Sequence, residues 1–153
     1  MLERLYRLCN NAINLKYSKM VFYVFSDKDI QKIIIDLNRI DQLLYNGELP
    51  DGTLLPAYSH SYGVVSFDGK SVTKEKGQPY TLLDTGEFYR SFKVIPNPAG
   101  FIITANDEKE NGTLEDMYAK GGKLLGLTDE SMAKLSTEIY PKIKDYILDE
   151  LLR

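Results

Sequence analysis

The segment from Ser26 to Gly47 restricts the fold more than any other part of this 153-residue chain. Ser26 is a residue type that caps helix N-termini, Asp29 follows three residues later, and Gly47 is typical of the position just after a helix. The apolar residues between them recur at intervals of three and four, which places them on one helix face: Ile30, Ile33, Ile34, Leu37, Ile40 and Leu44. We therefore predict a long amphipathic helix that must bury one side.

Both ends of the chain have the same kind of spacing. The C-terminal segment from Thr128 predicts an amphipathic helix, with a kink or a new helix start near Tyr140 because Pro141 lacks a backbone donor. Residues 2–15 predict a first helix, in which Cys9 is expected to be a small core residue. The run "MVFYVF" at 20–25 fits either a short buried strand or an extension of the helical region. The apolar positions of the first helix are Leu2, Leu5, Tyr6, Cys9, Ala12 and Ile13.

The middle of the chain has a different composition. Residues 48–80 are rich in Gly, Pro, Ser and Tyr, which predicts a long irregular loop with at most one strand, at "SYGVVSF". The runs "FKVIP" and "GFIITAN" predict a hairpin, and "TLEDMYAK" predicts a short helix with Thr113 as its N-terminal cap. Residues 1–153 are therefore expected to form a single α+β domain, in which a small antiparallel sheet is packed by N- and C-terminal amphipathic helices.

Composition limits the classes of function. The hydrophobic fraction of 43% and the charged fraction of 27% are ordinary for globular proteins. A net charge of −3 argues against a general nucleic-acid binder, because phosphate contacts need clustered Lys and Arg. The longest apolar run is far shorter than the roughly 20 residues that cross a bilayer. We therefore expect no membrane association and a protein made in the cytosol.

The residues that usually carry chemistry are sparse. The single histidine, His60, lies in a polar loop, which argues against Ser-His or Cys-His catalysis. One histidine and one cysteine, Cys9, do not form a zinc signature. The run "GGKLLG" departs from the spacing of a phosphate-binding loop. The sequence therefore predicts no metal and no cofactor.

The stretch "TLLDTGEFYRSF", residues 81–92, has two interpretations. Asp-Thr-Gly is the catalytic motif of aspartic proteases, and in the retroviral type each subunit of a dimer gives one such aspartate. That pattern continues as a strand, whereas here Phe88 and Phe92 lie four residues apart, with Ser91 beside them, as on a helix. We therefore predict a helix that is capped by Asp84 or Thr85. Gly86 is expected to permit the tight turn into this helix, and both phenylalanines are expected to anchor it. This favours a protein without enzymatic activity, and the dimeric protease remains the alternative.

Three stretches occur in a characteristic order: "LYNGELPDGTLLPAYSHSY", "LLDTGEFYRSFKV" and "LLGLTDESMAKL". Over roughly residues 40–140 this order resembles the virion-morphogenesis or tail-completion proteins of tailed bacteriophages, the Mu-like and related head–tail joining group. The family has an Asp-Gly turn before a Tyr-Ser segment, then the Asp-Thr-Gly motif, then a turn that caps the last helix. The matching residues are Asp51, Gly52, Tyr58, Ser59, Asp84, Thr85, Gly86, Phe88, Ser91, Phe92, Gly126, Leu127 and Thr128.

The resemblance implies an α+β structural protein without catalysis, which completes the tail or joins the tail to the head of a phage or prophage. Its partners would be other phage tail, neck or connector proteins, and it would be a homo-oligomer or ring-associated subunit in the virion. It would be located in the host cytoplasm during assembly, with the loop at 48–80 as an assembly element. Direct DNA contact is not expected, because "GVVSFDG" is apolar and acidic. A generic protein-binding module unrelated to phages is a further alternative.

Overall fold

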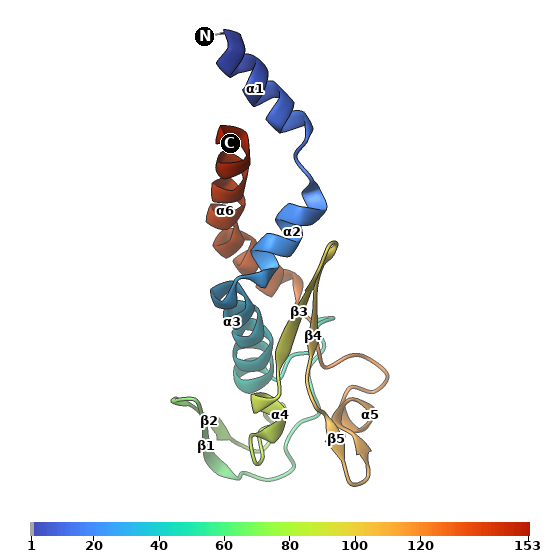
Figure 1. Ribbon diagram of the computed structural model, residues 1–153. Helices are drawn as coiled ribbons and strands as arrows, with labels where there is room; N and C mark the ends of the chain where they lie inside the picture. Colours follow the sequence, from blue (N-terminus) through green and yellow to red (C-terminus); the bar gives the residue numbers. More distant parts are fainter. Residues whose placement is uncertain (1) are drawn as a thin grey trace.

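The chain folds into an elongated molecule in which a helical arm stands on a base of hairpins and loops (Figure 1). The computed structural model describes residues 2–153. About 49% of the residues are helical and 18% lie in strands. Within residues 2–153 the strands form small antiparallel sheets of two strands each. The predicted α+β class, with helices at both termini, is confirmed.

The first part of the chain is helical throughout. It comprises α1 (Leu2–Ile13), α2 (Tyr17–Ser26), α3 (Lys28–Asp36) and the π-helix η1 (Leu37–Asn46). The run "MVFYVF" therefore belongs to a helix, one of its two predicted conformations. Gly47 ends η1 in the left-handed conformation, with φ of 59°, as predicted.

The predicted N-cap at Ser26 is wrong. Ser26 is the last residue of α2, and the next helix begins one residue later than expected. Asp27 is its cap, because Oδ1 of Asp27 accepts hydrogen bonds from the backbone N–H groups of Asp29 at 2.9 Å and Ile30 at 3.2 Å. The chain therefore changes direction at Asp27 rather than within α2.

The hairpins follow in the second part of the chain. The strands are β1 (Gly63–Phe67) and β2 (Lys70–Lys74), then β3 (Lys93–Asn97) and β4 (Gly100–Thr104), and finally β5 (Glu108–Lys109) and β6 (Gly112–Thr113). The predicted β3–β4 hairpin is confirmed, with Val94 paired to Ile103 and both buried. The expectation of at most one strand in residues 48–80 is wrong, because β1 pairs with β2 there. Asp68 and Gly69 both have positive φ, as a tight hairpin turn requires.

The remaining helices are α4 (Glu87–Arg90), α5 (Leu114–Tyr118) and α6 (Asp129–Leu152). Thr113 caps α5 as predicted, since its hydroxyl accepts a hydrogen bond from the N–H of Asp116 at 3.1 Å. Thr128 caps α6 in the same way, through the N–H of Ser131 at 3.2 Å. Helix α6 continues through Pro141 as one helix and does not restart there.

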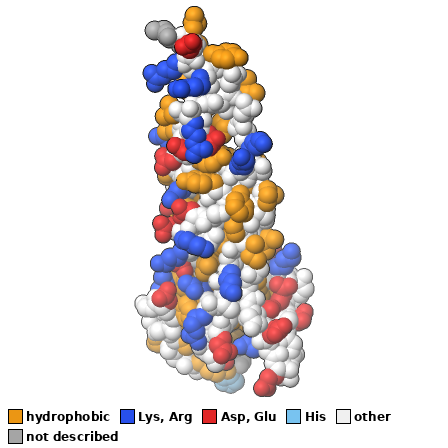
Figure 2. Space-filling model, viewed as in Figure 1, with side chains coloured by type: hydrophobic (Ala, Val, Ile, Leu, Met, Phe, Trp, Pro, Cys, Tyr) orange, Lys and Arg blue, Asp and Glu red, His pale blue; other side chains and the backbone are white. Residues whose placement is uncertain are grey.

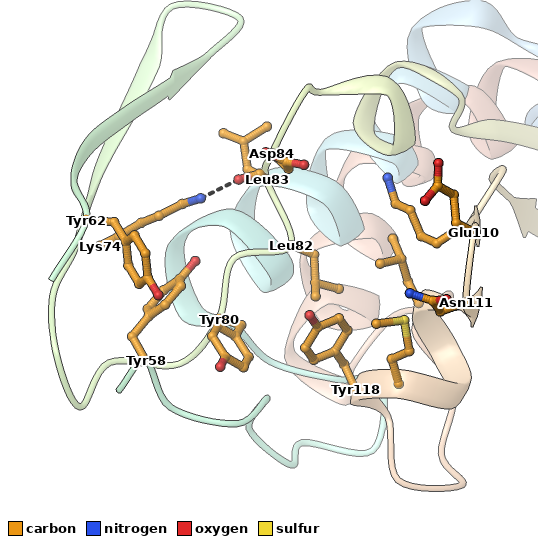
Figure 3. Close-up of a pocket in the computed structure, with 13 residues that line it drawn as sticks. Tyr58, Tyr62, Lys74, Tyr80, Leu82, Leu83, Asp84, Glu110, Asn111 and Tyr118 are labelled. Carbon is orange, nitrogen blue, oxygen red and sulfur yellow. Dashed lines mark hydrogen bonds between the residues drawn. The ribbon is translucent and has the colours of Figure 1, made fainter. Parts of the chain in front are cut away.

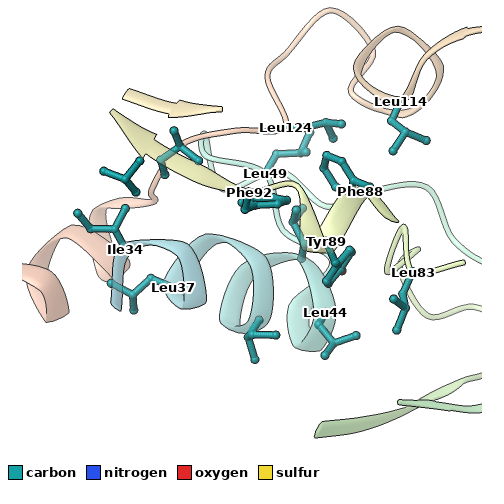
Figure 4. Packing of buried hydrophobic residues seen from close by; sticks show 14 of the residues in the cluster. Ile34, Leu37, Leu44, Leu49, Leu83, Phe88, Tyr89, Phe92, Leu114 and Leu124 are labelled. Atoms are coloured by element: carbon teal, nitrogen blue, oxygen red, sulfur yellow. The ribbon is translucent and has the colours of Figure 1, made fainter. Parts of the chain in front are cut away.

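The hydrophobic core lies between two parts of the chain. One part is α3 together with η1, and the other is formed by the later elements in the base. Helices α2 and α3 both pack on β3, and α2 also packs on β4. Figure 4 shows buried aliphatic side chains of α3 and η1 and aromatic rings of the segment around α4, which belong to the same hydrophobic cluster. The core residues that Figure 4 labels are Ile34, Leu37, Leu44, Leu49, Leu83, Phe88, Tyr89, Phe92, Leu114 and Leu124.

Helix α1 forms as predicted, but it does not join this core. It packs on α6, where Asn11 Nδ2 donates a hydrogen bond to the Leu151 carbonyl at 3.2 Å. None of residues 2–13, all of which the structure describes, is buried. Cys9 is exposed, so its predicted place in the core is wrong. The contact with α6 involves a different side of the helix from the one that carries Cys9.

The start of α3 is tied to the middle of α6 by an ion pair, in which Lys142 Nζ lies 2.6 Å from Asp27 Oδ2. The hydrogen bond from Lys142, supported by the backbone N–H groups of Ile30 and Asp29, lowers the pKa of Asp27 below its ordinary value of 3.8. A lowered carboxyl pKa contributes stability that is present above the unfolded-state pKa and is lost as the pH falls through the folded-state pKa.

The Asp27→Asn variant keeps a capping oxygen but loses the charge. We expect it to be less stable than the wild type at pH 7, with a difference that shrinks towards zero as the pH falls below about 4. Urea unfolding at pH 7, 5 and 3 measures this difference. Asp145→Asn, a change at an exposed aspartate of α6, is the matched control. A difference that stays constant over this pH range would contradict the proposed role of the ion pair.

Candidate functional site

The three sequence stretches that carry the family resemblance meet in the base of the molecule. The turn at Asp51 is held by its own carboxylate, whose Oδ1 accepts from the N–H of Thr53 at 2.9 Å and from its hydroxyl at 2.7 Å. The hydroxyl hydrogen bond is the main cause of the lowered pKa of Asp51. This turn packs on the third stretch, because a Cβ at Gly126 would lie 3.1 Å from Pro50. The first and third stretches are thus in contact.

Two buried amides of η1 hold the third stretch from the other side. Asn38 accepts from the N–H of Gly126 at 3.1 Å and donates to the Leu124 carbonyl at 3.4 Å. Gln42 accepts from the N–H of Thr128 at 3.0 Å and donates to the Gly126 carbonyl at 3.0 Å. Neither residue is more than 1% exposed. These amides position the start of α6, and the sequence analysis did not identify them.

The Asp-Thr-Gly segment leads into α4, but not through the predicted cap. The residue at the N-cap is Gly86, with φ of 81°, and it has no side chain that could cap this helix. Asp84 and Thr85 are exposed, and the Thr85 hydroxyl accepts a long hydrogen bond from the N–H of Glu87, at 3.4 Å. Gly86, rather than Asp84 or Thr85, therefore occupies the N-cap position, although the Thr85 hydroxyl still binds the first helical N–H. Glycine is favoured at 86, because a residue with a side chain is strained at this positive φ.

The aromatic residues of the motif are anchors, as predicted. Phe88 is 3% exposed and Phe92 is 6% exposed, with ring centroids 5.1 Å apart. Ser91 lies beside them, where its hydroxyl donates to the Phe88 carbonyl at 2.7 Å and accepts from the N–H of Asn106 at 2.8 Å. The motif thereby ties α4 to the segment after β4.

Tyr89 is a further buried member of this segment, which the sequence analysis missed. It is fully buried, and its hydroxyl donates a hydrogen bond to the Thr81 carbonyl. Burial raises the pKa of this phenol well above its ordinary value. The sequence did not indicate that Tyr89, which lies between Phe88 and Phe92, is also buried, because a helix of four residues is too short to show a periodic pattern. Tyr89 therefore holds the backbone before Asp84 from inside the core.

A cleft of about 550 Å³ opens beside this backbone (Figure 3). Tyrosine rings from distant parts of the chain form its wall: Tyr58 lies 4.6 Å from Tyr80, and Tyr80 lies 5.3 Å from Tyr118, centroid to centroid. Tyr62, Leu82, Leu114 and Met117 add further apolar surface, and the other lining residues include Lys74, Asp84, Lys109, Glu110 and Asn111. Such a surface combines apolar contact area with polar groups that fix orientation.

The wall of this cleft is shaped by side chains that bind its backbone. The Tyr58 hydroxyl accepts from the N–H of Thr81 at 3.1 Å, and Lys74 donates to the Leu83 carbonyl while lying 5.8 Å from the Tyr58 ring. Leu82, between these points, has φ of 56°, a conformation that residues other than glycine rarely adopt. Backbone in this region persists only when its surroundings fix it. The cleft is therefore a preformed feature of the fold.

The motif residues thus lie in several different parts of the base. Tyr58 and Asp84 line the cleft, whereas Phe88 and Phe92 belong to the core and Gly126 to the turn before α6. Ser59 is exposed, with its hydroxyl 2.9 Å from Nδ1 of His60, and neither residue lines the cleft. Gly52, with φ of 82°, completes the turn at Asp51, and Leu127 is half-buried before the cap at Thr128.

Two further properties of residues 2–153 bear on the kind of site. No group of three or more His, Cys, Asp or Glu side chains in this part of the chain is placed to hold a metal ion. Among the helices described, none has both the length and the apolar composition needed to span a membrane. Comparison with known proteins finds no matching family, no similar curated protein and no similar solved structure.

Proposed function

We propose that this chain is a structural assembly protein of a tailed phage or prophage, which completes the tail or joins it to the head through protein–protein contacts. The main support is that two of the three stretches that resemble the phage family contribute residues to the tyrosine cleft. Tyr58 comes from the first stretch and Asp84 from the second. Two residues that carry the resemblance therefore line one surface, and Phe88 and Phe92 belong to the core.

The cleft suits a protein segment as its occupant. Tyrosine is enriched at protein interfaces, because its ring gives apolar area while its hydroxyl still forms hydrogen bonds. Lys74, Lys109, Asp84 and Glu110 supply both signs of charge at the same surface, which favours a polypeptide over a uniformly charged ligand. We infer that a segment of a neighbouring tail, neck or connector protein binds here.

The alternative of a dimeric aspartic protease is less well supported. The retroviral pattern continues as a strand after Asp-Thr-Gly, whereas helix α4 follows Gly86 in this chain. The alternative predicts that purified protein cleaves peptides and that Asp84→Asn abolishes cleavage. Absence of cleavage at both acidic and neutral pH would remove it. A generic binding module would be favoured instead if the neighbouring genes encoded no portal, capsid or tail proteins.

Electron microscopy of lysates from a phage with this gene disrupted tests the assembly role. We expect separate filled heads and tails to accumulate, and added purified protein to restore complete particles. Complete virions formed without the protein would contradict the proposal. This measurement concerns the biological role and does not depend on which surface makes the contact.

A pair of tyrosine variants tests whether the cleft makes the contact. Tyr62 lines the cleft and is 64% exposed, so Tyr62→Ala should lower particle joining at least about tenfold without unfolding the chain. Tyr140 on α6 is 66% exposed and does not line the cleft, so Tyr140→Ala is the matched control and should join particles normally. Equal activity of the two variants would exclude the cleft as the contact surface.

A further inference from the structure

Helix α1 carries an apolar stripe that faces away from the rest of the chain. The stripe consists of Leu2, Leu5, Tyr6, Cys9, Ala12 and Ile13, all of which are exposed. On the opposite side of α1, Leu8 and Asn11 are half-buried, and Asn11 bonds to α6. Figure 1 places α1 at the far end of the arm, and Figure 2 shows hydrophobic side chains on the surface there. An amphipathic helix with its apolar side in water indicates a missing partner.

The exposed area matches that of a small interface. Leu2 is 82% exposed, Leu5 59%, Tyr6 70% and Ile13 80%. These side chains expose roughly 600 Å² together, at the upper limit of the largest apolar patch on a typical monomer. One side of a standard interface buries about 800 Å², so the stripe and its polar margins can supply most of one.

The order of side chains along the stripe is complementary to itself. The spacing Leu2, Leu5, Cys9, Ala12 alternates three and four residues, as in the seam between paired helices. When a second α1 lies antiparallel and is centred on Cys9, Leu5 meets Ile13 of the second copy. In the same arrangement the large Tyr6 meets the small Ala12, so that bulky and small side chains alternate across the seam.

The helix dipoles also favour this antiparallel arrangement, because an antiparallel pair orients them in opposite directions. The charged residues Glu3, Arg4 and Arg7 lie outside the stripe, towards the other side of α1, so the seam itself is apolar.

We propose that α1 pairs antiparallel with α1 of a second copy of this chain, forming a two-fold symmetric dimer with the two Cys9 side chains at its centre. Such an interface uses the same patch on both subunits and closes on itself. The dimer requires only this chain, so it goes beyond the proposed role in the virion and does not depend on it.

Mass and chemical cross-linking of the purified full-length protein test the dimer. At about 100 μM we expect light scattering to give twice the chain mass of 17.5 kDa. Cys9 is the sole cysteine, so a short bismaleimide that adds one thiol at each end should yield a covalent dimer. A protein that stays monomeric at this concentration would overturn the proposal.

Charge substitutions identify the surface that makes the dimer. Leu5→Asp and Ile13→Asp should each weaken the dimer at least about 100-fold and abolish the Cys9 cross-link, because each places two charges in an apolar seam. Leu54→Asp is the matched control: Leu54 is 63% exposed, lies in the base, and its change should leave the dimer intact.

Circular dichroism separates loss of the interface from loss of the fold. The stripe variants should keep the wild-type helical signal and unfolding midpoint, since no residue of 2–13 is buried. A dimer that Leu5→Asp and Ile13→Asp leave unchanged would overturn the proposal by assigning another surface. A monomer that binds anionic vesicles through α1 would assign the stripe to lipid and would also overturn it. All these measurements use purified protein, so their failure leaves the lysate test of virion assembly unaffected.

Discussion

Replacing Phe88 by alanine is expected to lower the free energy of unfolding by about 3 to 5 kcal/mol, the usual cost of emptying a buried aromatic site. Phe88 is 3% exposed, and its ring packs edge-on against those of Tyr89 and Phe92 at centroid distances of 5.8 and 5.1 Å. The surrounding segments come from several parts of the chain and cannot all close over the cavity. Urea unfolding followed by circular dichroism measures the loss.

The control for this change lies four residues earlier in the same motif. Asp84 is exposed, so Asp84→Asn should alter the free energy of unfolding by no more than about 0.5 kcal/mol. The comparison tests whether the buried aromatic ring, rather than the exposed carboxylate, supplies the motif's contribution to stability. Equal losses of stability from the two variants would contradict the architectural interpretation.

Gln42→Met should cost about 2 to 4 kcal/mol, although it keeps nearly the same side-chain volume. Gln42 is 1% exposed and forms hydrogen bonds to the Thr128 N–H and the Gly126 carbonyl. Methionine leaves both backbone groups unpaired in the interior, which is more costly than the loss of two solvent-exposed hydrogen bonds. The free energy of unfolding in urea is again the measured quantity.

Gln78→Met provides the matched substitution at an exposed site. The side chain of Gln78 accepts one hydrogen bond, from the Glu75 N–H, and water can replace it. Its loss should therefore stay below about 1 kcal/mol. A similar cost at positions 42 and 78 would mean that the buried amide does not hold the turn before α6.

The parts of the fold that follow from local sequence patterns were predictable. Helical spacing in residues 26–47 and 128–152 is repeated over several turns, and Thr113 and Thr128 act on N–H groups only three residues away. The β3–β4 hairpin joins neighbouring segments of apolar residues. In each case the pattern and the interaction that stabilises it lie within the same short stretch of chain.

Other features depend on interactions that local spacing does not contain. A π-helix differs from an α-helix by a small shift of its hydrogen bonds, and in η1 the decisive contacts of Asn38 and Gln42 are with residues more than 80 positions away. The β1–β2 hairpin did have a local signal, Asp68-Gly69, which the composition of the surrounding loop obscured.

The candidate site shows the same limit. Tyr58, Tyr80 and Tyr118 have no periodic relation in the sequence, and only the folded chain brings their rings together. The Asp-Thr-Gly motif lies in a segment that borders the cleft. Residue preferences alone did not predict that Asp84 is exposed or that Gly86 occupies the N-cap position. For α1, the periodicity identified an apolar face correctly, while the exposed Cys9 shows that periodicity does not reveal whether the chain itself buries that face.

The contact between α1 and α6 also has a consequence for the order of folding. Asn11 and Leu151 are separated by 140 positions, so this contact cannot form on the ribosome until nearly the whole chain has been made. The hairpins pair strands that are close in sequence and have no such delay. We therefore expect the hairpins of the base to fold first during synthesis, and α1 to pack on α6 last.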